Sequence, residues 1–345
     1  MKVYIDPHSN IDYTAYYIKG LYDVFGESNV TFSNRHFRKL KPSHAIKFII
    51  YSHNTIHKYV IDWSDDSSIE PSDYAWCDVY GKINFNPEQT AEQYHQKIAS
   101  LAPSFGIKIW NNLDTSIYGF QNLVRIQRKI SKVKSFLSSY YKQSKQVAIN
   151  NYKPSKSATD YIYSINTLWS SDQWINNDET VNLYRANFMK VCKNLLNINF
   201  EGGFIYSKIK NMNPHFQKFI INAKWIPKET YINKIKASVL VFNTPAWALC
   251  HGWKLGEYLA LGKAIISTPI INELPEPLVH GKHIHIVSGN EDDIRDAIEL
   301  IISDTEYRQS LERNAHDYYL KYVSPSQSIR ILLQKCQAEV LQGVY

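Results

Sequence analysis

Short runs of β-branched and aromatic residues alternate with helix-like segments along almost the whole chain. The strand-like runs are KVYID, NVTFS, AIKFIIYS, KYVIDW, CDVYGKINF, GIKIW, DYIYSI, INFEGGFIY, AKWIP, SVLVF, AIIST and HIHIV. Helices are expected between them, at about residues 11–25, 87–101, 179–196 and 228–236 and from about 254 onward. Because strands that alternate with helices pair through crossover connections, the pattern predicts an α/β protein with mostly parallel sheets.

The length of 345 residues favours two such domains, since single hydrophobic cores stop growing near this size. The polar stretch NNYKPSKSATD (150–160) carries a proline and no periodic apolar pattern, which is typical of a linker. We therefore expect an N-terminal domain over 1–150 and a C-terminal domain over 151–322. Residues 323–345 are expected to form a helix that packs back on the N-terminal domain.

Composition narrows the class of protein. Hydrophobic residues make up 44% of the chain, no apolar run reaches the length of a membrane-spanning helix, and Asp6 interrupts the apolar start that a signal peptide requires. The four cysteines are far apart and lack the spacing of a metal site, so we expect reduced thiols in a cytoplasmic protein. The net charge of +7 indicates an anionic partner: nucleic acid, an anionic membrane, or phosphorylated substrates.

Part of that charge is concentrated in residues 118–145, which contain seven Lys or Arg and no Asp or Glu. Apolar residues recur there at close to helical spacing, so a basic helix is expected. One interpretation is a helix between domains with a solvated basic face. A second is a surface for anionic lipid, on the inner face of the cell membrane. Contact with nucleic acid is the third, and no recognition motif supports it.

The most informative stretch is VLVFNTPAWALCHGWKLGEYLALGKAIISTP (239–269), which is predicted to form strand, loop, helix and strand. Ligands bind open parallel sheets beyond the carboxyl ends of strands, and a following helix N-terminus suits a diphosphate. Gly252 allows close backbone approach to a ligand, and Gly262 is expected to end the helix. Lys254 and Glu257 share one helix face, where the cation suits phosphate and the carboxylate suits ribose hydroxyls. Alone, such a pair is more often an ordinary surface ion pair.

The run KLGEYLALGKAIISTPIINELPEPLVHGKHIHIV (254–287), with the later DDIRDAIELIISDTEYRQSLERNA (292–315), resembles the donor-binding half of GT-B glycosyltransferases. The resemblance covers roughly residues 160–323. It implies two Rossmann-like domains facing a central cleft and a nucleotide-sugar donor used as substrate. It also implies no cofactor and no metal, and the acidic pair Asp65 and Asp66 is read as a turn.

The resemblance also implies roles for individual residues. Lys254 would contact donor phosphate and Glu257 the ribose, while the diphosphate and sugar would be lined by His251, Gly252 and Trp253. Lys208 and Lys224 are further candidates to face the diphosphate. Leu249 stands where many retaining members carry a second glutamate, eight residues before the ribose glutamate. The identity of the sugar and the retaining or inverting outcome therefore stay open.

Polar residues at predicted strand ends in the first half are candidates for a general base that activates the acceptor. They are His8, Asp12, His53 and Asp62. For His8 the alternative is a solvated loop residue, with Asn10 capping the next helix.

The leading hypothesis is a glycosyltransferase that moves a hexosyl-type sugar onto a glycan or lipid-linked acceptor in surface polysaccharide or lipopolysaccharide synthesis. The alternatives are a GT-B sugar-nucleotide epimerase, for which no acid–base pair is identifiable, and a non-catalytic GT-B binding protein. A nucleic-acid binder driven by charge is a fourth reading, and nucleic acid is not expected as a partner.

Overall fold

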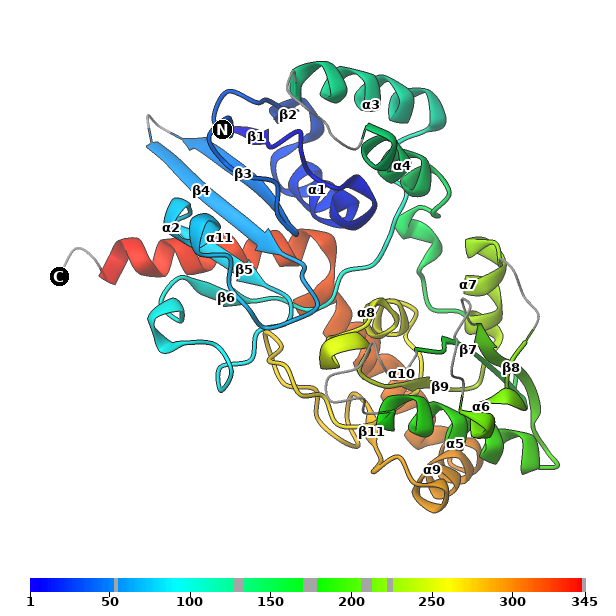
Figure 1. The fold of residues 1–345 in the computed structure, drawn as a ribbon. Helices are drawn as coiled ribbons and strands as arrows, with labels where there is room; N and C mark the ends of the chain where they lie inside the picture. The colour runs from blue at the N-terminus through cyan, green and yellow to red at the C-terminus, as the bar shows by residue number, and fades with distance from the viewer. Residues whose placement is uncertain (53–54, 127–132, 170–178, 206–212, 222–225, 343–345) are drawn as a thin grey trace. The chain divides into compact units, whose positions relative to one another are not determined.

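The structure is a computed structural model that describes residues 1–52, 55–126, 133–169, 179–205, 213–221 and 226–342, with side chains as far as residue 336. The chain divides into two compact units (Figure 1). Unit 1 comprises Met1–Asn151, Glu273–Glu276 and Lys321–Tyr345, and unit 2 comprises Tyr152–Asn272 and Pro277–Leu320. Each unit has its own sheet and core, so the two are described separately.

Unit 1 is built on a six-stranded sheet in the order β2-β1-β3-β4-β5-β6. The strands are β1 (Lys2–Ile5), β2 (Val30–Phe32), β3 (Ala45–Ser52), β4 (Thr55–Asp62), β5 (Val79–Lys82) and β6 (Ile98–Ser100). The short helix α2 (Pro71–Trp76) connects β4 to β5. All strands except β3 run in the same direction, so their carboxyl ends share one edge of the sheet.

The strand β3 is antiparallel to both β1 and β4 because only two residues separate its end from the start of β4. A connection that short can form a hairpin but not a crossover. Six of the eight ladders among the described strands are parallel, which confirms the predicted α/β class with mostly parallel sheets.

The long helix α11 (Pro325–Gln342) packs on α1 (Ile11–Phe25) and on β5 within unit 1. The two helices approach so closely that a Cβ at Gly20 would lie 2.1 Å from the carbonyl oxygen of Pro325. The Tyr16 hydroxyl also donates to the carbonyl of Val323 at 2.9 Å. Glycine at position 20 is therefore required by packing, and α11 is an integral part of the unit 1 core.

The basic segment 118–145 is not one helix, contrary to expectation. It is covered by α3 (Asn112–Ile126) and α4 (Val133–Ser144), while residues 127–132 lie outside the described part of the chain. The two helices pack side by side: the Tyr140 ring lies against Gly119 and its hydroxyl accepts from Asn122 Nδ2 at 2.9 Å. Residues 119 and 140 can meet only if the chain folds back between them, because one straight helix would separate them by roughly 30 Å.

The described residues of unit 2 form five parallel strands in two hydrogen-bonded groups, β8-β7 and β9-β10-β11. These are β7 (Tyr161–Thr167), β8 (Asn199–Ile205), β9 (Val241–Asn243), β10 (Ile265–Ser267) and β11 (His285–Ile286). The groups are joined because Val239 N–H donates to the Tyr161 carbonyl at 2.8 Å, just before β9 begins. The resulting order, β8-β7-β9-β10-β11, places β7 and β9 side by side at the centre.

Helices cover both faces of this sheet (Figure 1). On one face, α5 (Thr180–Asn194) and α9 (Glu291–Ser303) share a buried cluster with the strands, including Phe188, Phe242 and Ile298. On the other, α7 (Lys228–Ala237) contacts β7, and α8 (Trp253–Ala260) contacts β9. The helix α10 (Thr305–Tyr318) packs against α8 and β10, and the short α6 (Pro214–Gln217) follows β8.

The end of α8 agrees with the sequence prediction. Gly262 has φ of 57° and its N–H donates to the carbonyl of Leu259, while Lys263 N–H donates to that of Tyr258. These two hydrogen bonds form a Schellman motif, which needs a left-handed residue after the helix. Gly262 therefore fixes where α8 ends and β10 can begin.

Two secondary-structure predictions in unit 1 are wrong. Residues 87–101 form only one 3₁₀ turn (Glu92–Tyr94) followed by β6, because residues 98–100 pair with β5 instead of continuing a helix. The run GIKIW forms a single β-bridge, between Lys108 and Ala148, in place of a strand. In unit 2, most of the AKWIP run lies outside the described residues.

Candidate functional site

Two cationic side chains gather at the carboxyl ends of β7 and β9 in unit 2. Lys254, in the first turn of α8, donates from Nζ to Asn166 Oδ1 at 2.7 Å and to the carbonyl of Ile165, both on β7. Arg185, on α5, donates from Nε to Thr244 Oγ1 at 2.9 Å, and Thr244 directly follows β9. The two cations therefore approach the same strand ends from helices on opposite faces of the sheet.

This place is the topological switch point of the sheet. The chain passes from β7 to β8 on one side and then returns to β9 on the other, so the connections diverge between β7 and β9. Divergent connections leave a crevice beyond the carboxyl ends of these two strands, and ligands of open α/β sheets bind there. The cationic pair therefore lies where the topology predicts a ligand site.

Both cationic side chains in this cluster have pKa values below their ordinary values. Burial lowers the pKa of Lys254 to about 7, with the nearby Arg185 lowering it further and Glu257 opposing the shift. Burial also lowers the pKa of Arg185 to about 10. A buried cation stripped of water is costly unless it is paired, and an anionic ligand would supply the missing partner.

Sequence inspection did not identify Arg185, although a signal exists. The buried residues of α5 recur at helical spacing through Val181, Phe188 and Cys192, and Arg185 falls within that stripe. Its Nη1 donates to the Thr167 carbonyl at 3.2 Å and its Nη2 to the Pro245 carbonyl at 3.0 Å. Among the described residues it forms no ion pair with a carboxylate. A single arginine at a position of α5 where apolar residues recur was therefore the sequence signal for this site.

Glu257, one turn further along α8, is only 2% exposed. It forms an ion pair with Lys228 at the start of α7, and the Tyr152 hydroxyl donates to it at 3.4 Å. Both contacts are made to the same carboxylate oxygen, Oε1. Burial, with Glu257 next, raises the pKa of Tyr152 well above its ordinary value, so the phenol stays a hydrogen-bond donor. Sequence inspection identified Glu257 but not Lys228 or Tyr152.

The loop between β9 and α8 has a strained backbone. Ala248 and Leu249 have φ of 54° and 59°, a region that residues with a Cβ rarely adopt. Consecutive positive φ values are a form of strain that clusters at ligand sites. Leu249 is partly exposed, His251 is buried, and Gly252 directly precedes α8. A Cβ at Gly252 would meet only the Ala246 Cβ, at 3.5 Å, so protein packing does not require glycine there.

The remaining predicted donor contacts are Trp253, Lys208 and Lys224. Trp253 is the first residue of α8, next to Lys254. Lys208 and Lys224 lie outside the described residues.

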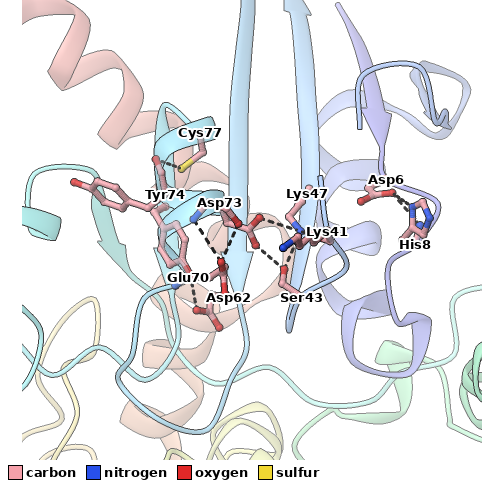
Figure 2. A network of polar contacts seen from close by, with 12 residues as sticks. Asp6, His8, Lys41, Ser43, Lys47, Asp62, Glu70, Asp73, Tyr74 and Cys77 are labelled. Atoms are coloured by element: carbon pink, nitrogen blue, oxygen red, sulfur yellow. Dashed lines mark hydrogen bonds and ion pairs between the residues drawn. The ribbon is translucent and has the colours of Figure 1, made fainter. Parts of the chain in front are cut away.

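Of the predicted general-base candidates of unit 1, His8 and Asp62 lie in separate groups of polar contacts (Figure 2). His8 Nδ1 lies 2.9 Å from Asp6 Oδ1, beyond the end of β1. Asp12 is buried in the first turn of α1. Asp62, at the end of β4, pairs with Lys82 at 3.1 Å and accepts from the Tyr80 hydroxyl at 2.6 Å. His53 lies outside the described residues.

A second buried ion pair lies near Asp62. Lys47 Nζ is 3.1 Å from Asp73 Oδ1, and the Ser43 hydroxyl donates to Asp73 Oδ2 at 2.5 Å (Figure 2). Burial raises the pKa of Asp73, and Ser43 and Lys47 oppose the shift. The two pairs border a cavity of about 650 Å³ whose lining includes the carboxylates Asp62, Asp66, Glu70 and Asp73. Because Asp62 is already held by a lysine and a phenol, its geometry is that of a structural ion pair.

The described residues contain no group of three or more His, Cys, Asp or Glu side chains placed to hold a metal ion. Among the helices of this described part, none has the length and apolar character needed to cross a bilayer. All four cysteines are buried, and none of them forms a disulfide.

No protein-family model matches the chain, and no curated protein matches it. Structures similar to it include GT-B glycosyltransferases and UDP-GlcNAc 2-epimerases, all at low identity. A glycosyltransferase from Rickettsia africae is 13% identical, over 80% of this chain and 83% of that chain, with a TM-score of 0.38. HepE of Anabaena in complex with UDP-glucose is 10% identical, over 83% and 98% of the two chains, with a TM-score of 0.35.

TarM of Staphylococcus aureus, in a complex that includes UDP, is 10% identical over 85% of this chain and 62% of that chain, with a TM-score of 0.43. At these TM-scores the likeness carries no argument about chemistry. The residues of the chain itself therefore have to support any assignment of function.

Proposed function

We propose that the chain is a glycosyltransferase that holds a nucleotide-sugar donor at the switch point of unit 2. The single observation that carries the proposal is the pair of buried cations, Lys254 and Arg185, at the carboxyl ends of β7 and β9. A diphosphate bears two negative charges at neutral pH when esterified at both ends. It therefore matches the two cations in number and sign.

The N-terminus of α8 strengthens this match. Gly252 is the N-cap of α8 and has no side chain, so no N-cap side chain competes with an anion at this helix end. Helix N-termini also carry a partial positive charge that favours phosphate. Lys254 sits in this first turn, so the helix end and the ammonium act on the same ligand group. His251 and Trp253, on either side of Gly252, are proposed to line the diphosphate and the sugar.

Glu257 is proposed to hold the ribose. Lys228 and Tyr152 both contact Oε1 and orient the carboxylate, and the buried Tyr231 phenol also interacts with Glu257. We propose that Oε2 is the oxygen that accepts from a ribose hydroxyl. A carboxylate that is oriented in advance loses less conformational freedom on binding. The ion pair with Lys228 is thus proposed to position the Glu257 carboxylate, which accepts the hydrogen bond from the ribose hydroxyl.

Transfer breaks the bond between the anomeric carbon and the diphosphate oxygen, and the electron pair leaves with the nucleoside diphosphate. The acceptor hydroxyl oxygen forms the new bond and gives its proton to a base. Lys254 and Arg185 stabilise the charge that develops on the leaving diphosphate, the task that a metal performs in other transferases. We propose that this enzyme works without a metal, and activity that persists in excess EDTA would support this.

Leu249 does not indicate which sugar the site binds. This side chain cannot accept a hydrogen bond from a sugar hydroxyl or stabilise a positive anomeric carbon, as a glutamate would. The acceptor is proposed to be a glycan or lipid-linked sugar in surface polysaccharide or lipopolysaccharide synthesis. The anomeric configuration of the product distinguishes a retaining from an inverting outcome, and substitution of candidate side chains identifies the base that an inverting reaction needs.

The test is a panel of nucleoside diphosphates and nucleotide sugars, scored by thermal stabilisation and by slow donor hydrolysis. One base and one sugar should stabilise the protein more than the others. Glu257→Gln keeps the shape of the side chain and should weaken that nucleotide roughly tenfold, the loss of one charge-assisted hydrogen bond. The matched control is Glu299→Gln, an exposed glutamate of α9 in the same unit. If no nucleotide stabilises the protein, the proposal is wrong.

An epimerase and a non-catalytic binding protein would each give a different result with the same panel of nucleotides. An epimerase would release a new nucleotide sugar without an acceptor. A non-catalytic binding protein would bind a nucleotide and hydrolyse or transfer nothing. Neither has a residue set in the described part of the chain that favours it over transfer.

We also propose that α3 and α4 bind unit 1 to an anionic membrane surface. Four apolar side chains of α3 recur at i, i+4, i+7 and i+11 and are exposed: Leu113, Ile117, Phe120 and Val124. Leu113 is 69% exposed and Phe120 67%. The opposite side of α3 holds its buried residues Thr115, Gly119, Asn122 and Ile126. The stripe is therefore an unpaired face and not part of the core.

Three exposed apolar residues of α4, Val133, Leu137 and Tyr141, recur at i, i+4 and i+8. The segment 118–145 that contains most of both faces has seven cations and no acid. Exposed apolar stripes with basic neighbours insert into the interface of an anionic bilayer, whereas nucleic acid offers no hydrocarbon to cover them. The occupant that fits both properties is an anionic lipid surface.

Vesicles of phosphatidylglycerol and phosphatidylcholine, pelleted with the protein, test this second proposal. Phe120→Ser should reduce the bound fraction severalfold on phosphatidylglycerol vesicles. Leu300→Ser, which removes an exposed leucine of α9 in unit 2, should not. Equal binding by the two variants, preference for nucleic acid over vesicles, or formation of a dimer that Phe120→Ser dissolves would contradict it.

A further inference from the structure

A basic pocket lies beyond the carboxyl ends of β1 and β2 in unit 1. Its volume is about 640 Å³, and it is lined by His8, Phe32, Ser33, Asn34, Arg35, Arg38, Leu40, Arg125 and Ile126. The lining includes three arginines and no Asp or Glu. The pocket lies entirely within unit 1, so it is distinct from the cation cluster of unit 2.

The fold brings these residues together from three parts of the chain. His8 follows β1, the two arginines at positions 35 and 38 follow the parallel neighbour β2, and Arg125 comes from the last turn of α3. Asn34 joins two of these parts, because its Nδ2 donates to the Arg125 carbonyl at 3.0 Å. The end of α3 is therefore held against the loop that carries Arg35 and Arg38.

The three arginines give the pocket lining a positive charge. Among the described residues, none of the three guanidiniums forms an ion pair. Arg125 Nη1 donates to the neutral Asn122 Oδ1 at 2.8 Å. Asp6, which does not line the pocket, contacts His8 Nδ1 at 2.9 Å, so Nε2 is the ring nitrogen that we assign to a ligand.

We propose that this pocket binds the phosphate group of a phosphorylated ligand. Guanidiniums recognise phosphate through paired N–H donors, and three of them converge here with the Ser33 hydroxyl and the His8 ring. Open parallel sheets bind ligands beyond the carboxyl ends of their strands, and β1 and β2 meet that condition. The inference does not depend on the proposed donor site, because no residue is shared between the two.

The phosphate belongs either to a small phosphorylated molecule or to a lipid headgroup. Arg125 is on the same helix as the exposed apolar stripe of α3, so a lipid phosphate can reach the pocket from a membrane that the stripe contacts. A soluble phosphate ester would reach the same donors from water, since Arg35 and Arg38 are exposed. The chemistry is the same, and the source is decided by experiment.

The test compares three full-length proteins: wild type, the double variant Arg35→Gln/Arg38→Gln, and the control Lys39→Gln. Lys39 is an exposed cation of the same loop that does not line the pocket. Each is titrated with glycerol 1-phosphate and with pyrophosphate by calorimetry. Each is also pelleted with phosphatidic acid vesicles, against phosphatidylglycerol vesicles of equal charge.

Weakening of glycerol 1-phosphate or pyrophosphate binding by tenfold or more in the double variant, with the control unchanged, would identify a site for soluble phosphate compounds. A selective loss of phosphatidic acid binding, with no response to the soluble probes, would identify a headgroup site. Equal binding of every probe by the double variant and the control would overturn the proposal. Nucleotide binding by the double variant should match wild type, and this separates failure here from failure of the donor site.

Discussion

Lys254 Nζ lies 2.7 Å from Asn166 Oδ1, which ties the first turn of α8 to the carboxyl end of β7. This contact places an ammonium next to Arg185 at the switch point of unit 2, with burial lowering the pKa of Lys254 to about 7. A lysine that is half neutral at physiological pH makes ligand binding depend on pH.

Nucleotide affinity should fall as pH rises above 7. In the free protein Lys254 loses its proton across this range, and binding of a diphosphate requires the proton to be regained. From pH 7 to 8.5, where the charge of a nucleoside diphosphate hardly changes, affinity should weaken roughly tenfold. Calorimetry at fixed ionic strength measures this. Lys254→Arg should flatten the slope, because a guanidinium stays charged, and identical slopes in both proteins would contradict the assignment.

The stability of the free protein should show the same titration with a definite sign. The pKa of Lys254 is about 7 in the folded state against 10.5 as its ordinary value, so the unfolded chain binds more protons between these two values. Burying the charged amine destabilises the fold fully below pH 7, and this cost disappears as pH rises through the window. Lys254→Met, which has no charge to bury, should therefore gain stability over wild type most at low pH. Its advantage should shrink by about 2 kcal/mol between pH 7 and 9, measured by urea unfolding.

Two glycines that flank α8 should behave in opposite ways. Gly262→Ala forces an alanine to φ of 57° and brings its Cβ within 3.2 Å of the Glu312 carbonyl oxygen, so stability should fall by about 1–2 kcal/mol with nucleotide affinity unchanged. Gly252→Ala should leave stability within about 0.5 kcal/mol of wild type, because φ is −73° and the nearest atom is 3.5 Å away.

If a ligand approaches the backbone at Gly252, however, nucleotide affinity of Gly252→Ala should fall at least severalfold. Urea unfolding measures the stability of both glycine variants, and calorimetry measures their nucleotide affinity. Unchanged affinity in Gly252→Ala would remove this glycine from the proposed site.

Asp62 should prove to be a stabilising residue of unit 1. Lys82 is fully buried and Asp62 almost so, and removing one partner of a buried ion pair leaves an uncompensated charge. Asp62→Ala should cost about 3–5 kcal/mol of unfolding free energy, whereas Asp62→Asn with Lys82→Met should cost much less. Unfolding measured separately for both proteins checks this. Little change in stability with a large loss of activity would instead restore Asp62 as a catalytic candidate.

The sequence was sufficient for features that depend on local chemistry. The alternation of strands and helices, the positions of β7 to β11, and the end of α8 at Gly262 all follow from periodicity and glycine conformation, and all are found. The predicted helix over 87–101 is absent because residues 98–100 gain more by pairing with β5, a partner that local pattern does not show. The basic segment folds into two helices because Tyr140 packs back on Gly119, which is a tertiary contact.

Some residues of the proposed site could be predicted from the sequence and others could not. Lys254 and Glu257 could be selected because they stand together in a recognisable run. Asn166 and Lys228 could not, and Arg185 was marked only by its place in the apolar stripe of α5. These residues come from β7, α7 and α5, and only the tertiary fold brings them to Lys254, Glu257 and Thr244. In unit 1, the arginine pocket depends on the loop after β2 meeting the end of α3, residues about 90 positions apart. Such assemblies are visible only after folding.

The most direct test of the account is the affinity of the best nucleoside diphosphate in the panel for wild type, Lys254→Gln and Lys282→Gln. Lys282 is an exposed lysine of unit 2 with the same nominal charge, so it controls for long-range attraction. Lys254→Gln should weaken binding by tenfold or more while Lys282→Gln changes it by less than twofold. Equal affinities for all three folded proteins would show that the diphosphate does not bind at the switch point between β7 and β9.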